Sequence, residues 1–182
     1  KKAFKENEGP ILVVKSVNDR TFPNSLSTLM AHAEGRRDII FFNEHFDHAI
    51  VSSLRNLCDC YVSLHRSEGL GLTISEAMCL GKPVIATGYS GNMDFMTENN
   101  SIPIPWEYAL AGPNAFPYQA DARWAEPNID EAAKAMRYVY ENDAAAKKLG
   151  EQAKKDMAEK FSLEACGTRM AARLSKVQLR SQ

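Results

Sequence analysis

Two glutamates, Glu68 and Glu76, lie on either side of a glycine-containing segment, residues 69–75. A short apolar run at residues 61–64 comes before them, and a second one at residues 84–87 follows. This order predicts a strand, a glycine loop, a helix and a second strand. Glycines let backbone N–H groups approach a ligand closely, and the start of a helix adds unpaired donors and a partial positive charge. The pattern therefore predicts a site for an anionic ligand.

The two carboxylates limit what that ligand can be. A site for simple phosphate would avoid negative charge, because Glu68 and Glu76 would repel the anion. A carboxylate does accept hydrogen bonds from neighbouring hydroxyls with both of its oxygens. The pair therefore favours a ligand that carries hydroxyls as well as an anionic group, as a nucleotide sugar does.

The elements around this site predict an α/β fold. Short apolar runs that suit burial on both faces predict strands at residues 11–14, 39–42, 61–64 and 84–87. Helices are predicted between them, from about Pro23 to a stop at Gly35, from a cap at Asp47, and from about Leu72 to Leu80. Alternating strands and helices indicate a doubly wound parallel sheet with right-handed crossovers.

Beyond residue 87 the pattern changes. A short helix is predicted near residues 92–97 and an edge strand at 102–104, since Pro103 suits only an edge. Residues 105–127 combine several prolines and aromatics without periodicity, which predicts a long irregular loop, either functional or a surface flap. Apolar spacing in the remainder predicts extra C-terminal helices over about 129–139, 143–157 and 162–177.

The composition is that of one globular domain over residues 1–182. Hydrophobic residues make up 45% and charged residues 25%, and the net charge of −1 gives no basic field for nucleic acid. No apolar run reaches transmembrane length. The four cysteines form no Cys-x-x-Cys pair, which favours buried free thiols in a reducing, cytoplasmic location.

Four motifs follow one another in this part of the chain: Cys58-Asp59-Cys60-Tyr61-Val62, Glu68-Gly69-Leu70-Gly71-Leu72, Glu76-Ala77-Met78 and Gly81-Lys82-Pro83-Val84-Ile85-Ala86-Thr87. The Glu-x7-Glu spacing alone is a weak signal, but the joined block is specific. Through this block, the chain from about residue 38 to residue 97 resembles the C-terminal, donor-binding half of GT-B fold glycosyltransferases, in particular glycosyltransferase family 4.

The resemblance implies a role for each residue of the block. Glu76 would bind two ribose hydroxyls, and Glu68, the expected catalytic residue, would face the donor sugar. Backbone N–H groups would hold the diphosphate, which makes Gly69, Leu70, Gly71, Leu72 and Thr73 substrate-binding residues. The family implies a retaining, metal-independent reaction without a cofactor, and the sequence has no Asp-x-Asp for a divalent ion. The alternatives are a solvent-facing helical Glu76, a loop acid at Glu68 and glycines that serve only a tight turn.

Two departures from the family pattern affect this site. Where many members have Pro-Ser, this chain has Leu64-His65 and then Arg66. We expect His65 and Arg66 to donate to phosphate or sugar oxygens, and the alternatives are a structural histidine and a surface charge. Asp94 stands where the family often has a longer Glu, so its reach is shorter.

The family's first strand, its Arg-Lys loop and the acceptor-binding N-terminal domain have no counterpart in this sequence. We therefore expect a chain truncated at its start, inactive alone, with that missing domain as a partner. The complete enzyme would move a sugar from a nucleotide diphosphate sugar to a glycan or lipid-linked acceptor, as in polysaccharide biosynthesis. We expect it to act in the cytoplasm, either free or peripherally at the inner membrane face. The rivals are another GT-B enzyme such as a nucleotide-sugar epimerase, and a non-catalytic binding or assembly module.

Overall fold

The computed structural model describes residues 1–17, 23–113, 115 and 117–178. The chain divides into two compact units, Lys1–Leu54 and Arg55–Gln182. Unit 1 contributes the first two strands, and unit 2 contains the complete glutamate–glycine block.

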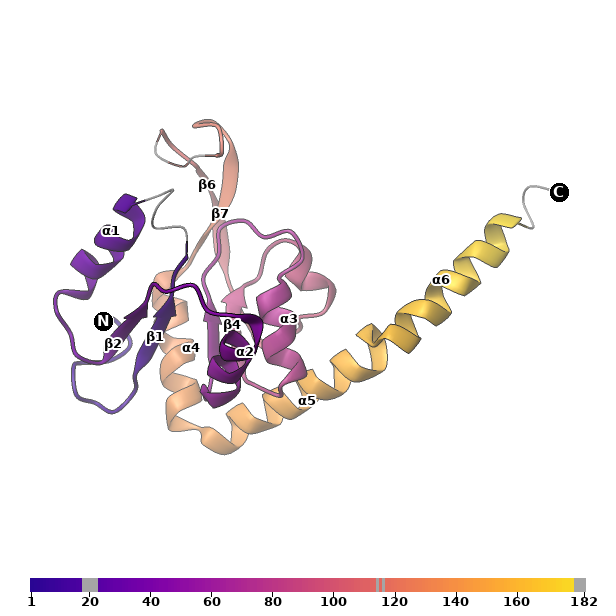
Figure 1. Cartoon of the computed structure of the whole chain (residues 1–182), viewed down its shortest axis with the longest axis horizontal. Coiled ribbons are helices and arrows are strands. Elements are labelled where there is room, and N and C mark those ends of the chain that lie inside the picture. Colours follow the sequence, from indigo (N-terminus) through magenta and orange to yellow (C-terminus); the bar gives the residue numbers. More distant parts are fainter. Residues whose placement is uncertain (18–22, 114, 116, 179–182) are drawn as a thin grey trace. The chain divides into compact units, whose positions relative to one another are not determined.

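Unit 1 has a strand–helix–strand order (Figure 1). Strand β1 (Leu12–Lys15) pairs in parallel with β2 (Ile39–Phe42), and α1 (Pro23–Ala33) connects them. Helix α2 (His48–Leu57) starts in this unit, and the carboxylate of Asp47 accepts a 2.8 Å hydrogen bond from the Ile50 amide. The predicted strands, the helix between them and the Asp47 cap are therefore confirmed.

Unit 2 is built on a parallel sheet in the order β3–β4–β5. The strands are β3 (Tyr61–Ser63), β4 (Val84–Thr87) and β5 (Ile102–Ile104), and α3 (Leu72–Cys79) joins the first two. All four residues of β4 are buried, as expected for a central strand. The predicted edge strand containing Pro103 is confirmed.

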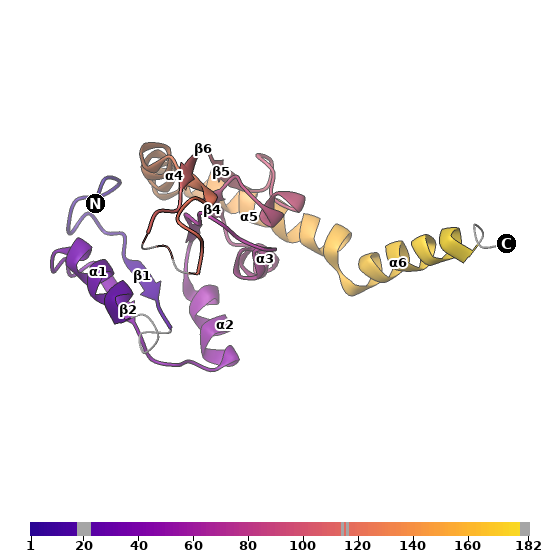
Figure 2. The ribbon, with the colours of Figure 1, turned by 90° about the horizontal axis from the view of Figure 1, so that it is seen from above.

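Helices cover both faces of this sheet (Figure 2). On one face, Val84 and Ala86 of β4 pack in a cluster with residues of α3 and α5 (Asp143–Phe161). On the other face, Ile85 packs in a cluster with residues of α4 (Ile129–Glu141). Alternate side chains of a strand point to opposite faces, so this four-residue strand supplies both clusters.

Three C-terminal helices follow the sheet, as predicted. Only Asn142 separates α4 from α5, and only Ser162 separates α5 from α6 (Leu163–Gln178). Helix α5 approaches the turn after α3 closely, because a Cβ on Gly150 would lie 2.1 Å from the Gly81 carbonyl oxygen. Parallel sheets with flanking helices and added C-terminal helices define a Rossmann-like α/β fold.

The predicted irregular loop at 105–127 is wrong at both of its ends. Strands β6 (Trp106–Leu110) and β7 (Arg123–Pro127) pair antiparallel along their whole length and form a hairpin beyond the end of β4 (Figure 1). Residues 114 and 116 of that segment lie outside the described residues. The only local signal is in β6, where large apolar residues stand at every second position (Trp106, Tyr108 and Leu110). The prolines lie beside the strands or at the last position of β7, where they break no central ladder.

The short helix predicted at 92–97 is also different. It is a 3₁₀ turn, η1 (Gly91–Asp94). The buried Asn92 donates to the Thr87 carbonyl oxygen at 2.9 Å, which folds this turn back onto the end of β4.

Candidate functional site

The start of α3 is an open helix N-terminus. Its N-cap residue, Gly71, has φ of 83°, a left-handed conformation that glycine adopts without steric cost. No side chain among the described residues caps this helix, and its first turn holds no acid. By contrast, the side chain of Asn128 caps α4, whose first turn carries two acids. The positive end of α3 is therefore available to an anion.

Most of the glycine loop is accessible. Gly69, Leu70, Leu72 and Thr73 are exposed, and only Gly71 is buried. A Cβ on Gly71 would lie 3.2 Å from both the Asn92 Cβ and the Ile74 side chain, so the position is tight as well as left-handed. The structure thus brings the predicted diphosphate-binding residues together at the helix start.

Glu68 lies in a loop that packs against the turn after β4. The Ser90 hydroxyl donates to the Glu68 carbonyl oxygen, and Ser90 itself has φ of 82°, which is strained for a residue with a Cβ. Gly91 packs so closely against Gly69 that a Cβ there would lie 2.0 Å from the Gly69 carbonyl oxygen. The Glu68 carboxylate accepts a 3.0 Å hydrogen bond from the Gly69 amide.

Glu76 lies on α3 and forms an ion pair with Arg55 of α2. The Arg55 Nη1 is 2.6 Å from the Glu76 Oε2, and the exposed fractions of the two side chains are 14% and 40%. The carboxylate is therefore partly open to solvent although one of its oxygens is bound.

His65 makes contacts within the protein. Its Nε2 lies 3.0 Å from the Tyr89 carbonyl oxygen, and its Nδ1 lies 3.2 Å from the Ser63 hydroxyl. If Nε2 carries the proton, the ring donates to Tyr89 and accepts from Ser63, and both nitrogens are satisfied. The histidine joins the end of β3 to the turn after β4.

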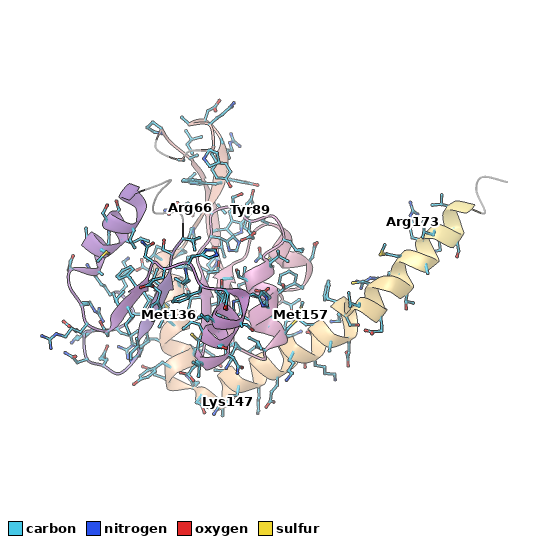
Figure 3. All side chains as sticks on the ribbon, in the orientation of Figure 1. Arg66, Tyr89, Met136, Lys147, Met157 and Arg173 are labelled. Carbon is cyan, nitrogen blue, oxygen red and sulfur yellow. The ribbon has the colours of Figure 1, made fainter. Side chains whose placement is uncertain are left out.

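Arg66 anchors the hairpin. Its guanidinium donates through Nη2 to Glu126 Oε1 at 2.8 Å and through Nε to the other carboxylate oxygen, and it lies over the Trp124 ring at 5.1 Å. Its carbonyl oxygen accepts from the Ala125 amide at 2.9 Å. The hydrogen bonds from Arg66 lower the pKa of Glu126 and raise that of Arg66. Arg66 and Tyr89 both lie at the base of the hairpin (Figure 3).

Aromatic rings complete the base of the hairpin. Trp106 donates through Nε1 to the Gly88 carbonyl oxygen at 2.7 Å, and its ring meets Tyr89 edge to face at 4.6 Å. Tyr108 extends this contact to Trp106 at 4.9 Å. The hairpin is thus fastened to the turns after β3 and β4, the same turns that carry Glu68 and Ser90.

Sequence reasoning missed three residues that shape this site, namely Arg55, Ser90 and Gly91. Nothing local marks Arg55, whereas a glycine next to a serine in a turn is a usual sign of special backbone geometry. Asp94 is exposed at the end of η1.

The cysteines lie apart from the glutamate–glycine block in their chemistry. The four cysteines are free, as predicted, but the expectation of burial is wrong, because Cys79 is exposed and Cys58, Cys60 and Cys166 are only half-buried. Burial raises the pKa of Cys60 to about 12. Within the described ranges, no three His, Cys, Asp or Glu side chains are grouped to hold a metal ion. None of the helices in the described part of the chain has the length and apolar character to cross a membrane.

Several solved structures are similar to this chain. HepE (Alr3699) from Anabaena, in complex with UDP, matches with a TM-score of 0.67 and 17% identity over 94% of this chain and 42% of that one. A glycosyltransferase from Rickettsia africae matches with a TM-score of 0.68 and 22% identity over 95% of this chain and 41% of that one. The C-terminal domain of LpcC, a glycosyl transferase group 1 family protein from Francisella tularensis, matches with a TM-score of 0.59 and 18% identity over 80% of this chain and 65% of that one.

At these identities the similarity establishes the fold alone, which is that of GT-B enzymes. The chain spans about two-fifths of the length of the first two proteins. No curated protein matches it. The family model "Glycosyl transferases group 1" matches residues 2–156, so the chain belongs to the glycosyl transferases group 1 family.

Proposed function

We propose that this chain is the donor-binding half of a glycosyltransferase of family 4. The enzyme would transfer a sugar from a nucleotide diphosphate sugar to a glycan or lipid-linked acceptor, with retention of the anomeric configuration and without a metal ion. The observation that carries the proposal is the uncapped, acid-free start of α3, flanked by Glu68 and Glu76. HepE, which shares the fold, has been solved with UDP and with UDP-glucose.

In this proposal the diphosphate binds the backbone N–H groups between Gly69 and Thr73. The helix start stabilises its negative charge, and it stabilises the leaving diphosphate in the same way as the sugar departs. Glu76 accepts hydrogen bonds from two ribose hydroxyls. Glu68 faces the donor sugar, where a fixed carboxylate stabilises the positive charge that develops during transfer.

His65 and Arg66 have a different place in the proposal from the one the sequence suggested. His65 is hydrogen-bonded to Tyr89 and Ser63, and Arg66 is hydrogen-bonded to Glu126. We therefore assign them to holding the Glu68 loop, rather than to direct contact with phosphate.

The test is titration of the 182-residue chain with UDP, GDP and ADP and with the corresponding nucleosides, followed by calorimetry and amide chemical shifts. One diphosphate should bind more tightly than its nucleoside and should shift the amides of residues 69–73. EDTA should leave that affinity unchanged. Failure of all three diphosphates to bind would overturn the proposal.

Substitutions of the two glutamates should have different effects on ligand affinity in the same assay. Glu76→Gln should weaken diphosphate binding by about 10- to 100-fold, because hydrogen bonds to a charged group contribute about 1.5–3 kcal/mol. Glu68→Gln should leave diphosphate affinity unchanged and weaken only the matching nucleotide sugar. Glu141→Gln, on the exposed side of α4, is the control and should change neither affinity. An unchanged diphosphate affinity for Glu76→Gln would refute the ribose assignment.

Turnover requires an acceptor site as well. Transfer needs both substrates in near-attack geometry, and unit 2 accounts only for the donor. We expect the 182-residue chain alone to bind the donor without forming a glycosylated product. Product formation by this chain from a panel of nucleotide sugars and acceptors would contradict that expectation.

A further inference from the structure

The ion pair between Arg55 and Glu76 bears on a conflict within the proposed site. Two carboxylates beside a diphosphate-binding helix start would repel the ligand. The first turn of α3 carries no acid, but Glu76 lies one turn further on, so its negative charge needs to be compensated. The Arg55 guanidinium, 2.6 Å from the Glu76 carboxylate, cancels that charge. The side chain of Arg55 is only 14% exposed, so solvent screens the pair less than it would screen a surface pair.

The geometry also leaves Glu76 able to bind a ligand. The ion pair joins one guanidinium nitrogen to one carboxylate oxygen, Oε2, and the Glu76 side chain remains 40% exposed. A carboxylate oxygen has two lone pairs, and Oε1 has no partner among the residues that the structure describes. Arg55 therefore fixes the carboxylate from the protein side and leaves acceptor capacity on its solvent side.

Arg55 itself is held in place. It lies in the last turn of α2, where a cation is favoured by the helix dipole. The next residue, Asn56, accepts a 2.6 Å hydrogen bond from the Lys82 Nζ through its carbonyl oxygen. Lys82 follows α3, so two contacts connect the end of α2 with α3 and the turn after it.

We propose that Arg55 is a positioning residue of the donor site. It orients the Glu76 carboxylate for the ribose hydroxyls and neutralises the charge that Glu76 would otherwise present to the diphosphate. This inference rests on the proposed function, because it assigns Arg55 an effect that acts through a Glu76–nucleotide contact.

The experiment is a double-mutant cycle on the 182-residue chain, with the nucleoside diphosphate that binds most tightly among UDP, GDP and ADP. Arg55→Met keeps the approximate length of the side chain and removes its charge, and the Glu76 carboxylate that it leaves unpaired is 40% exposed, so water can solvate it. It should weaken diphosphate binding about tenfold, since both the orientation and the neutralising charge are lost. Arg55→Lys restores the charge and should recover most of that affinity.

The effect of Arg55→Met in a chain that already carries Glu76→Gln distinguishes a positioning role of Arg55 from a purely structural one. If Arg55 acts through Glu76, Arg55→Met should change affinity less than about twofold in that background, because contacting residues are non-additive. Arg137→Gln removes an arginine that pairs with Glu141 on α4, and this control should bind like wild type.

The outcomes separate the two proposals. If Glu76→Gln weakens binding but Arg55→Met does not, only the role of Arg55 is refuted. An equal loss from Arg55→Met in both backgrounds would show a structural role and would also refute it. If Glu76→Gln has no effect, the ribose assignment fails and the role of Arg55 fails with it. Should Arg55→Met not fold, a tenfold loss in Arg55→Lys would contradict the proposal, since that variant keeps the charge.

Discussion

The close approach of Gly91 to Gly69 makes a sharp prediction for Gly91→Ala. The new Cβ would lie 2.0 Å from the Gly69 carbonyl oxygen and 3.1 Å from the Leu70 Cα. Non-bonded heavy atoms pack at about 3.5 Å, so the turn after β4 and the glycine loop must separate by about 1 Å or more. Both sides of this contact are backbone, so no flexible side chain can relieve the overlap.

The expected magnitude follows from that overlap. Overpacking costs about 1–3 kcal/mol, and in a chain of this size each kcal/mol lowers the melting temperature by roughly 2–4 °C. We therefore expect Gly91→Ala to melt about 2–12 °C below wild type. The displaced loop should also bind a nucleoside diphosphate about tenfold more weakly, because hydrogen bonds to a charged ligand are worth about 1.5–3 kcal/mol and depend on geometry.

The assay is thermal unfolding by circular dichroism, followed by calorimetric titration with the diphosphate. Gly69→Ala is the matched control for stability, because a Cβ there meets no atom within 4 Å and its φ is not positive. Its unfolding free energy should stay within about 0.5 kcal/mol of wild type. A melting temperature for Gly91→Ala equal to that of Gly69→Ala would show that the two backbone segments do not meet as described.

Three further predictions concern the scaffold around the site. Gly150→Ala should lower the melting temperature, because its Cβ would lie 2.1 Å from the Gly81 carbonyl oxygen. Gly167→Ala has open space around its Cβ and should stabilise α6 by about 0.5–1 kcal/mol, and the same thermal assay tests both variants. Hydrogen bonds from Lys160 and Asn100 lower the pKa of Asp156, so its contribution to stability is present above its ordinary pKa, about 3.9, and is lost as the pH falls below it. The difference in unfolding free energy between wild type and Asp156→Asn should therefore be constant from pH 7 to about pH 5 and shrink below about pH 4, and a difference that grows in acid would contradict this sign. The amide of Ala125, which donates to Arg66, should exchange with solvent at least about tenfold more slowly than that of Gln119 in the exposed turn, and equal rates would show that β7 is not anchored.

Much of the fold could be predicted from local chemistry. The apolar runs at 39–42 and 84–87 match β2 and β4 residue for residue, and the edge strand containing Pro103 was found at 102–104. Burial on both faces demands continuous apolar residues, so such strands are visible in sequence. The glycine loop and the helix after it were predicted for a similar reason, because a left-handed position such as Gly71 requires a specific residue type.

The hairpin shows where local reasoning was insufficient. The prolines in 105–127 suggested an irregular loop, yet its two ends, Trp106–Leu110 and Arg123–Pro127, pair with each other, and Arg66 anchors the second of them. Proline is excluded only from central positions of a sheet, and the sequence alone does not show which positions are central.

The sequence by itself determined where the anion site is proposed, because glycines, a helix start and two glutamates lie within one continuous block. Only the tertiary structure decided what surrounds that block. Arg55 forms an ion pair with Glu76, and Arg66 forms one with Glu126. Ser90 and Gly91, in the turn after β4, contact the loop that carries Glu68. Such contacts join segments that are far apart in the chain, and their energy depends on distance and burial in the folded state, which no local pattern encodes.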